Sequence, residues 1–286
     1  MAYRVVLVPV MGDPAEQHAL DVTRAITGMM RTHIVGIHVR HPLRMMASGG
    51  LFDPGYMTPS VIEAIEQSDR AAAAEARDKF HKWREASGID CAVSPPASGG
   101  TTAEWHEVQA PVAEEIARRA RTVDLTVVAR SGRQYLFDTD QTLHGALWES
   151  GRPVLLVPGG SATSLFDTVV IAWNDSREAA HAVSAAWSLI GRARRLVVFV
   201  GGESEALRHS AERLVSHLAW RGYAPATVLG DSSEETGVGL LAVAGRERAG
   251  LIIMGAYSHS RLRHLVFGGA TSFVLRHAAI PVLMAH

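Results

Sequence analysis

The chain closes with the segment GLIIMGAYSHSRLRHLVFGGATSFVLRHAAIPVLMAH, which runs from Gly250 to His286. An apolar run ends at a glycine and is followed by a polar, cationic loop. A stretch with helical spacing then leads to a second apolar run. This order is typical of a strand, a loop, a helix and another strand. The glycine pair at 268–269, where the loop enters the helix, is consistent with an anion site and equally with a simple turn.

The closing segment has a counterpart earlier in the chain. DLTVVAR at 124–130 matches GLIIMGA at 250–256, and RPVLLVP at 152–158 matches IPVLMAH at 280–286. Each pair is separated by a loop and a short helical stretch of similar length. Such self-similarity indicates an internal duplication.

Both halves also open with an apolar run, a helical stretch and a second apolar run, which together predict a βαβ unit. We therefore expect two domains, at 1–158 and 166–286, joined by the linker-like sequence GGSATSL at 159–165. Alternating strands and helices predict an α/β fold with a parallel sheet and right-handed crossovers. Such a sheet binds ligands at the carboxyl ends of its strands.

Each domain is expected to contain five strands. In the first domain the apolar runs place them near 4–10, 33–39, 89–93, 124–129 and 153–157. In the second domain they fall near 168–173, 195–200, 223–229, 250–254 and 280–285.

Composition excludes several classes of protein. Of the 286 residues 47% are hydrophobic, so a large core is expected, and the formal net charge of -1 gives no support for binding nucleic acid or an anionic membrane. The single cysteine, Cys91, cannot form an intrachain disulfide, and its apolar neighbours predict a buried strand position. The N-terminal apolar run is too short for a secretory signal or a membrane span. We therefore expect a cytoplasmic protein.

Common catalytic motifs are missing from the sequence. It contains no G-x-x-x-x-G-K-[ST], no G-x-S-x-G, no dinucleotide glycine motif after a first strand and no H-E-x-x-H. These absences argue against the usual NTPase, α/β-hydrolase, Rossmann oxidoreductase and zinc-protease sites.

The closing block resembles the universal stress protein family in its tandem two-domain form. VVIAWNDSREAAHAV in the second half and AEWHEVQAPVAEEIARRARTVDLTVVAR in the first extend the resemblance along the chain. It implies two doubly wound domains, each with strand order 3-2-1-4-5, packed as a pseudo-dimer through the fifth strands. It also implies a role in the stress response, and it places WHE, at 105–107, between the third strand and the third helix.

The resemblance further implies a nucleotide site in the second half. Family members that bind ATP carry a glycine, two residues, a second glycine, nine residues, and a third glycine followed by Ser or Thr. Here Gly255 takes the first position, Ser258 the second and Gly268 the third. Gly269 stands at the Ser/Thr position, where its amide remains available, and Thr271 could supply a hydroxyl two residues later.

These family members also carry an acidic residue at the end of the first strand. Here that position falls on Asn174, with Asp175 beside it, and either side chain would face the ribose or a metal. His259 and Arg261 could contact phosphate. The implied ligand is ATP or AMP, with magnesium, although Asn174 is a poorer metal partner than a carboxylate.

The matching positions in the first half have changed more. Met11 stands at the acidic position, and Asp138 and Asp140 lie in the loop where phosphates would bind. Two carboxylates would repel a phosphate unless a metal lay between them. We therefore expect a structural copy without a nucleotide site.

Three functions stay open. The first is a regulatory binding module with one nucleotide site. The second is a scaffold or chaperone-like protein whose glycines serve only the fold. The third is slow ATP hydrolysis, which needs Asp175 or His259 to activate water, whereas no nucleophile–base pair is apparent. Protein partners and a homodimer of tandem chains are both compatible with the sequence. The long segment 41–60 is either a flap over a cleft or a cover for the sheet edge.

Overall fold

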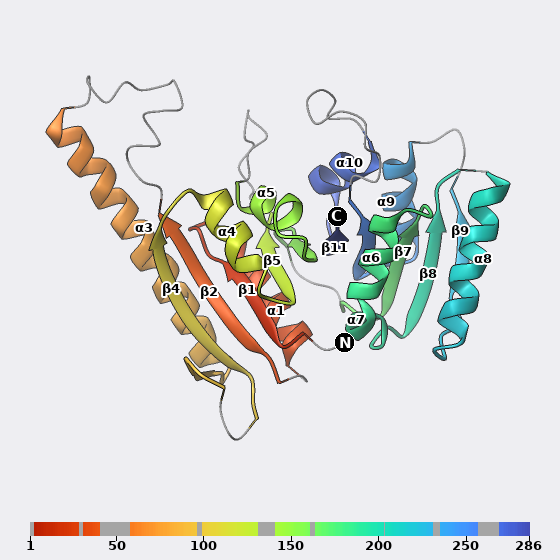
Figure 1. Ribbon diagram of the computed structural model, residues 1–286, viewed down its shortest axis with the longest axis horizontal. Coiled ribbons are helices and arrows are strands. Elements are labelled where there is room, and N and C mark those ends of the chain that lie inside the picture. Colours follow the sequence, from red (N-terminus) through yellow and green to blue (C-terminus); the bar gives the residue numbers. More distant parts are fainter. Residues whose placement is uncertain are drawn as a thin grey trace. The chain divides into compact units, whose positions relative to one another are not determined.

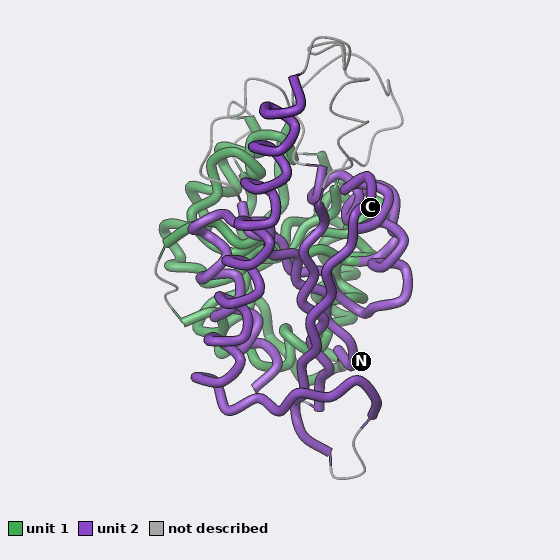
Figure 2. Tube along the Cα trace, turned by 90° about the vertical axis from the view of Figure 1, so that its left-hand side faces the viewer, with its two compact units in different colours: residues 1–2, 153–286 green, residues 3–152 purple. Residues whose placement is uncertain are grey.

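The computed structural model describes residues 3–28, 31–40, 58–95, 99–130, 141–160, 164–202, 204–230, 235–256 and 269–286. The chain forms two compact units, which Figure 2 shows in different colours. We call Tyr3–Arg152 the N-terminal unit and Pro153–His286 the C-terminal unit. Both units have the predicted α/β architecture with parallel strands.

The N-terminal unit has a parallel sheet with the strand order β3-β4-β2-β1-β5 (Figure 1). Its strands are β1 Val5–Pro9, β2 His33–Arg40, β3 Asp90–Cys91, β4 Thr102–Gln109 and β5 Leu125–Ala129. Its helices are α1 Glu16–Thr27, α3 Pro59–Ala86, α4 Val112–Ala120 and α5 Gln141–Trp148. Helix α1 packs against α3, and α4 packs against α5 on the opposite face of the sheet.

The C-terminal unit has the strand order β6-β11-β10-β7-β8-β9 (Figure 1). Its strands are β6 Val154–Val157, β7 Thr168–Trp173, β8 Arg195–Val200, β9 Ala226–Leu229, β10 Leu251–Gly255 and β11 Val282–Ala285. Its helices are α6 Arg177–Ala185, α7 Trp187–Ile190, α8 Glu205–Ala219, α9 Thr236–Arg246 and α10 Ala270–His277. Counted from β7, the order is 3-2-1-4-5, which confirms the predicted winding.

Strand β6 is the antiparallel member of this sheet. Leu156 pairs with Val282, and Leu155 pairs with Leu283. The implied packing of the two repeats through their fifth strands, RPVLLVP and IPVLMAH, is therefore confirmed, and the two strands are antiparallel. By sequence β6 belongs to the first repeat, yet it lies in the C-terminal unit. The domain limits 1–158 and 166–286 stay a prediction.

The apolar runs form the cores of both sheets. In β7, Val169, Val170 and Ile171 have no solvent exposure, because helices cover both faces of a doubly wound sheet. Each such side chain contributes roughly 1.5–3 kcal/mol when fully buried. β-Branched residues also restrict their own rotamers in a way that suits strands. Burial and local preference therefore agree along these segments.

The third strand of the N-terminal unit differs from the prediction at 89–93. Strand β3 is two residues long and pairs only with β4, whereas β4 pairs with β2 along its whole length. The sequence TAEWHEVQ alternates polar and apolar residues, as a half-buried strand does. Trp105 packs on Phe80 of α3, with their ring centroids 5.3 Å apart. The stretch 105–107 is thus part of a strand and not a connection.

The prediction of a buried cysteine was wrong. Cys91 is exposed, because β3 lies at the edge of the sheet. Most of the segment 41–60, from 41 to 57, lies outside the described residues, so both interpretations of that segment stay predictions. Within the ranges given above, no helix combines the length and apolar character needed to cross a membrane.

Candidate functional site

The predicted site lies at the carboxyl edge of the C-terminal sheet. Strands β7 and β10 run side by side in parallel, with Ala172 opposite Met254. Strands β8 and β9 lie beyond β7 on one side, and β11 lies beyond β10 on the other. The winding direction therefore switches between β7 and β10, where doubly wound sheets bind their ligands.

Asn174 organises the turn that follows β7. Its Oδ1 accepts hydrogen bonds from the Ser176 hydroxyl at 2.7 Å and from the Ser176 amide at 3.3 Å. The Ser176 hydroxyl in turn accepts from the Ala179 amide at 3.1 Å and caps α6. This cap satisfies one of the free N–H groups in the first turn of α6. The residue at the family's acidic position thus supports the turn through its own side chain.

Asp175 is held against α8. Its backbone has φ of +60°, a left-handed conformation that Asp tolerates better than most residues. Its Oδ1 accepts from the Ser210 hydroxyl, and its Oδ2 lies 3.7 Å from an Arg213 guanidinium nitrogen. Ser210 is buried and also accepts from Trp173 Nε1 at 3.0 Å. The Ser210 hydroxyl thus holds Oδ1, whereas Oδ2 has only a long, solvent-exposed ion pair with Arg213.

Gly255 is required by packing at the end of β10. A Cβ atom there would lie 2.5 Å from the Ala179 nitrogen and 2.7 Å from the Glu178 carbonyl carbon. Both are backbone atoms in the first turn of α6, which packs on β10. Only a residue without a Cβ allows this close approach. The glycine therefore has a structural reason, whether or not a ligand binds.

Gly269 is required by backbone conformation where α10 begins. Its φ is +131°, and a Cβ atom built on it would meet nothing within 4 Å. Because α10 connects two parallel strands, it begins at the carboxyl edge of the sheet. Thr271, in the first turn of α10, is 9% exposed.

The structure thus places five of the predicted residues around this edge, namely Asn174, Asp175, Gly255, Gly269 and Thr271. The other four, Ser258, His259, Arg261 and Gly268, lie outside the described residues. Sequence analysis missed Ser210 and Arg213, which hold Asp175. Both are 35 or more residues away along the chain, and no local pattern links them to the turn.

The matching turn in the N-terminal unit contains a buried carboxylate that the sequence did not reveal. Glu16, which is 3% exposed, accepts from the Met11 amide and, at 3.1 Å, from the Gly12 amide. Lys79 Nζ lies 3.3 Å from its Oε2. Burial raises the pKa of Glu16 above its usual value. Backbone hydrogen bonds of Met11, Asp13 and Gly12 and the positive charge of Lys79 lower it, but they offset the effect of burial only in part.

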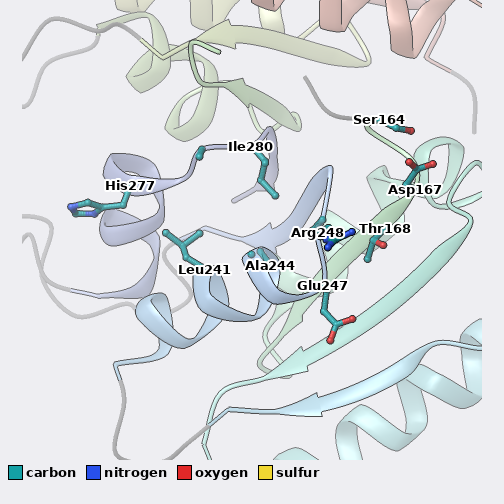
Figure 3. A pocket seen from close by; sticks show the side chains of 12 residues that line it. Ser164, Asp167, Thr168, Leu241, Ala244, Glu247, Arg248, His277 and Ile280 are labelled. Atoms are coloured by element: carbon teal, nitrogen blue, oxygen red, sulfur yellow. The ribbon is translucent and has the colours of Figure 1, made fainter. Parts of the chain in front are cut away.

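A separate pocket of about 680 Å³ opens at the amino edge of the C-terminal sheet (Figure 3). It is lined by Ser164, Asp167, Thr168, Leu241, Ala244, Gly245, Glu247, Arg248, Ala249, His277, Ala279 and Ile280. Glu247 pairs with Arg195 at 2.8 Å, and Asp167 pairs with Arg194 at 3.2 Å. The acidic groups are thus neutralised by arginines, and the remaining surface is mostly apolar.

This pocket lies at the opposite edge of the sheet from the predicted site, beside the first residue of β7. It contains no arrangement of side chains that suggests a reaction. Across the described ranges, no group of three or more His, Cys, Asp or Glu side chains could hold a metal ion.

Comparison with known proteins relates the C-terminal part of the chain to one family. Residues 192–286 match the family model described as the Universal stress protein family. A universal stress protein of Synechocystis sp. is 61% identical over 33 residues. That alignment covers 12% of this chain and 12% of the relative, so the chain matches about an eighth of the relative's length.

Solved structures resemble the chain along its whole length. A universal stress protein from Archaeoglobus fulgidus has a TM-score of 0.73 at 17% identity, and the match covers 100% of this chain and 99% of that one. A functionally unknown protein from Pseudomonas aeruginosa has a TM-score of 0.58 at 17% identity, covering 99% and 92%. These similarities show that the fold is shared across both halves.

Proposed function

We propose that the C-terminal unit, whose residues 192–286 match the Universal stress protein family model, binds an adenine nucleotide and that the protein acts as a stress-response binding module. The ligand is ATP or AMP, bound at the carboxyl edge between β7 and β10. A cytoplasmic location, protein partners and a homodimer of tandem chains belong to the same proposal.

The observation that supports this most directly is the meeting of two turns at the switch in winding. Asn174 follows β7, and Gly255 ends the neighbouring strand β10. The chain then enters α10 through Gly269, whose positive φ suits a backbone that presents N–H groups to an anion. Phosphates bind well at such helix entries, because the first amides of a helix have no partner within it.

Asn174 sets the expected dependence on metal. A neutral amide is a weaker ligand for magnesium than a carboxylate, and the Asp175 carboxylate is already engaged by Ser210 and Arg213. We therefore expect the affinity for nucleotide to change little between magnesium and a chelator.

The test is a calorimetric titration of the nucleotide-free protein with ATP, with and without magnesium. One site per chain is expected. Gly269→Ala should weaken it about tenfold, because alanine relaxes out of the positive-φ conformation in the free protein and restoring that conformation on binding costs roughly 1–2 kcal/mol. Gly222→Ala is the matched control, because Gly222 lies in the same unit with φ of +85° and open space around its Cβ position. No heat at millimolar ATP from a folded protein would rule out the proposal.

A second candidate function is a scaffold or chaperone-like protein that binds no nucleotide. The close approach of α6 to Gly255 favours it, since that glycine is explained by packing alone. The engagement of Asp175 by α8 favours it as well. This function would be supported if the folded protein gave no heat on titration with ATP and formed a stable complex with a protein partner.

A further inference from the structure

The β1–α1 turn of the N-terminal unit surrounds a carboxylate of the chain itself. Two backbone N–H groups, from Met11 and Gly12, donate to the two oxygens of Glu16. The ammonium of Lys79, on α3, lies 3.3 Å from Oε2 and also donates to the Asp13 carbonyl at 3.1 Å. Three donors from two separate parts of the chain therefore converge on one buried anion.

The C-terminal unit contains the same turn without the carboxylate. Val6 of β1 pairs with Leu125, and Val169 of β7 pairs with Leu251, so these two valines are equivalent in the repeat. Gly12 and Asp175 each lie six residues further on (12 − 6 and 175 − 169), and their φ angles are +98° and +60°. The two turns thus have the same left-handed residue at the same place.

The position of Glu16 is filled differently in the second copy. Glu16 lies ten residues after Val6, and Ala179 lies ten residues after Val169 (16 − 6 and 179 − 169). Alanine has no group that could reach the turn amides. The carboxylate is consequently a feature of the N-terminal unit, and in the second copy the Asn174 side chain supports the turn instead.

The donors around Glu16 select for an oxyanion. Hydrogen bonds from N–H groups and an ammonium to a charged oxygen are stronger than neutral ones, and two oxygens on one centre satisfy both amides together. Without the Glu16 carboxylate these three donors lose the acceptor that they share, and an anion of similar size can take its place in the vacated volume.

We propose that the N-terminal unit contains a site for a small oxyanion, such as a carboxylate or inorganic phosphate, which its own Glu16 occupies and closes. The site consists of the Met11 and Gly12 amides and the Lys79 ammonium. An external anion binds there only in competition with Glu16. This site is independent of the nucleotide site proposed for the C-terminal unit, and either proposal can fail alone.

The test removes the internal carboxylate from the full-length chain by the substitution Glu16→Ala. Alanine is the residue at the equivalent position, 179, of the second repeat. The Met11 and Gly12 amide resonances are followed by NMR while sodium formate or sodium phosphate is added, with sodium chloride at equal ionic strength as the reference. Saturable shifts are expected in the variant, with an apparent affinity at least about tenfold above that of the wild type, since each charged hydrogen bond contributes roughly 1.5–3 kcal/mol. Formate and phosphate titrations together show which oxyanion the site prefers.

Two controls separate the site from general effects of charge. Lys79→Met in the Glu16→Ala background should abolish the shifts, because it removes the cationic donor. Glu115→Ala removes another buried carboxylate of the same unit, which pairs with Arg118 and Arg119 and has no contact with the turn. It should leave the Met11 and Gly12 amides unresponsive to formate.

A folded Glu16→Ala protein whose Met11 and Gly12 amides ignore both anions would overturn the proposal. If that variant does not fold, Glu16→Gln provides the test. The carboxamide has one acceptor oxygen in place of two, and Lys79 favours that oxygen at the position of Oε2, beside the Gly12 amide. The Met11 amide then loses its acceptor, so its exchange with deuterium should accelerate about tenfold. An unchanged exchange rate would likewise refute the closed site.

Discussion

Replacing Gly255 by alanine separates the two reasons for a glycine at the end of β10. The new Cβ atom would lie 2.5 Å from the Ala179 nitrogen, 2.7 Å from the Glu178 carbon and 3.0 Å from the Ala179 Cα. These atoms belong to the backbone of α6 and cannot rotate away as a side chain would. Helix α6 must therefore shift from the sheet, or β10 must bend.

The expected change in the free energy of unfolding for Gly255→Ala follows from two opposing effects. Overpacking a well-packed contact costs typically 1–3 kcal/mol. An alanine also restricts the unfolded chain and so recovers roughly 0.4–1 kcal/mol. The free energy of unfolding of the C-terminal unit should therefore fall by about 1–2 kcal/mol. Urea unfolding, followed by hydrogen exchange of the β10 amides, measures this loss without nucleotide present.

Gly245→Ala is the matched control for this experiment. Gly245 lies in α9 of the same unit, its φ is ordinary and a Cβ atom there would meet nothing within 4 Å. Alanine should stabilise this helix by roughly 0.5–1 kcal/mol. If Gly255→Ala left the urea midpoint unchanged and reduced ATP binding, the packing argument would be wrong and close approach of a ligand would explain the glycine.

Three further changes test individual contacts. Burial alone would raise the pKa of Glu115, but hydrogen bonds from Arg119 and Arg118 hold it below its usual 4.5. The paired carboxylate thus stabilises the fold above pH 4.5, and this stabilisation is lost as the pH falls through the lowered pKa. In Glu115→Gln the free energy of unfolding should therefore fall less steeply between pH 4.5 and lower pH. A decline as steep as that of the wild type would contradict this. Arg248 has φ of +49° at the end of α9, where glycine has no steric cost. Arg248→Gly should therefore raise the free energy of unfolding by about 1 kcal/mol in a urea titration. A loss of stability would show that the arginine side chain contributes more than the strain costs. Gly145→Ala places a Cβ atom 2.1 Å from the Ala113 carbonyl oxygen. It should lower the free energy of unfolding of the N-terminal unit by about 1–3 kcal/mol in the same urea titration. An unchanged urea midpoint would mean that α5 moves freely against α4.

The positions of the central strands could be predicted from the sequence because burial and local preference agree there. The run at 168–173 was expected as a strand and is one, with Val169 to Ile171 fully buried. The repeat supported each strand a second time, since equivalent strands such as β5 and β10 have the same apolar pattern. Internal duplication therefore supported the strand positions more firmly than either half would alone, whereas the order of the strands was an expectation from the family resemblance.

The edge of the N-terminal sheet was harder to predict. The apolar stretch around Cys91 appeared to be the better strand, whereas TAEWHEVQ contains three charged or titratable residues. Strand β3 pairs with only Thr102 and Ala103 of β4, so within the described residues most of β4 has one open backbone side, and its composition resembles that of a loop. Only the alternation of Ala103 and Trp105 with polar neighbours indicated β4.

The sequence predicted that Asn174 and Gly255 lie at one sheet edge, but not which side chains surround them. Spacing placed Asn174 and Gly255 at one sheet edge, because each follows a recognisable strand. The partners of Asp175 and Glu16 come from helices 35 and 63 residues away, at Ser210 and Lys79. Contacts over such separations depend on tertiary packing, which leaves no periodic signal in one sequence.

The pairing of β6 with β11 determines how the two repeats can be produced separately. A fragment beginning at 166, after the linker, would contain every strand of the second repeat but would lose β6. The backbone groups of Leu155 and Leu156, which pair with β11, would then be missing, and β11 would become an open edge made of buried apolar residues. Such edges recruit other chains. We expect that fragment to associate with itself through β11, and a fragment beginning before Pro153 to keep β11 paired.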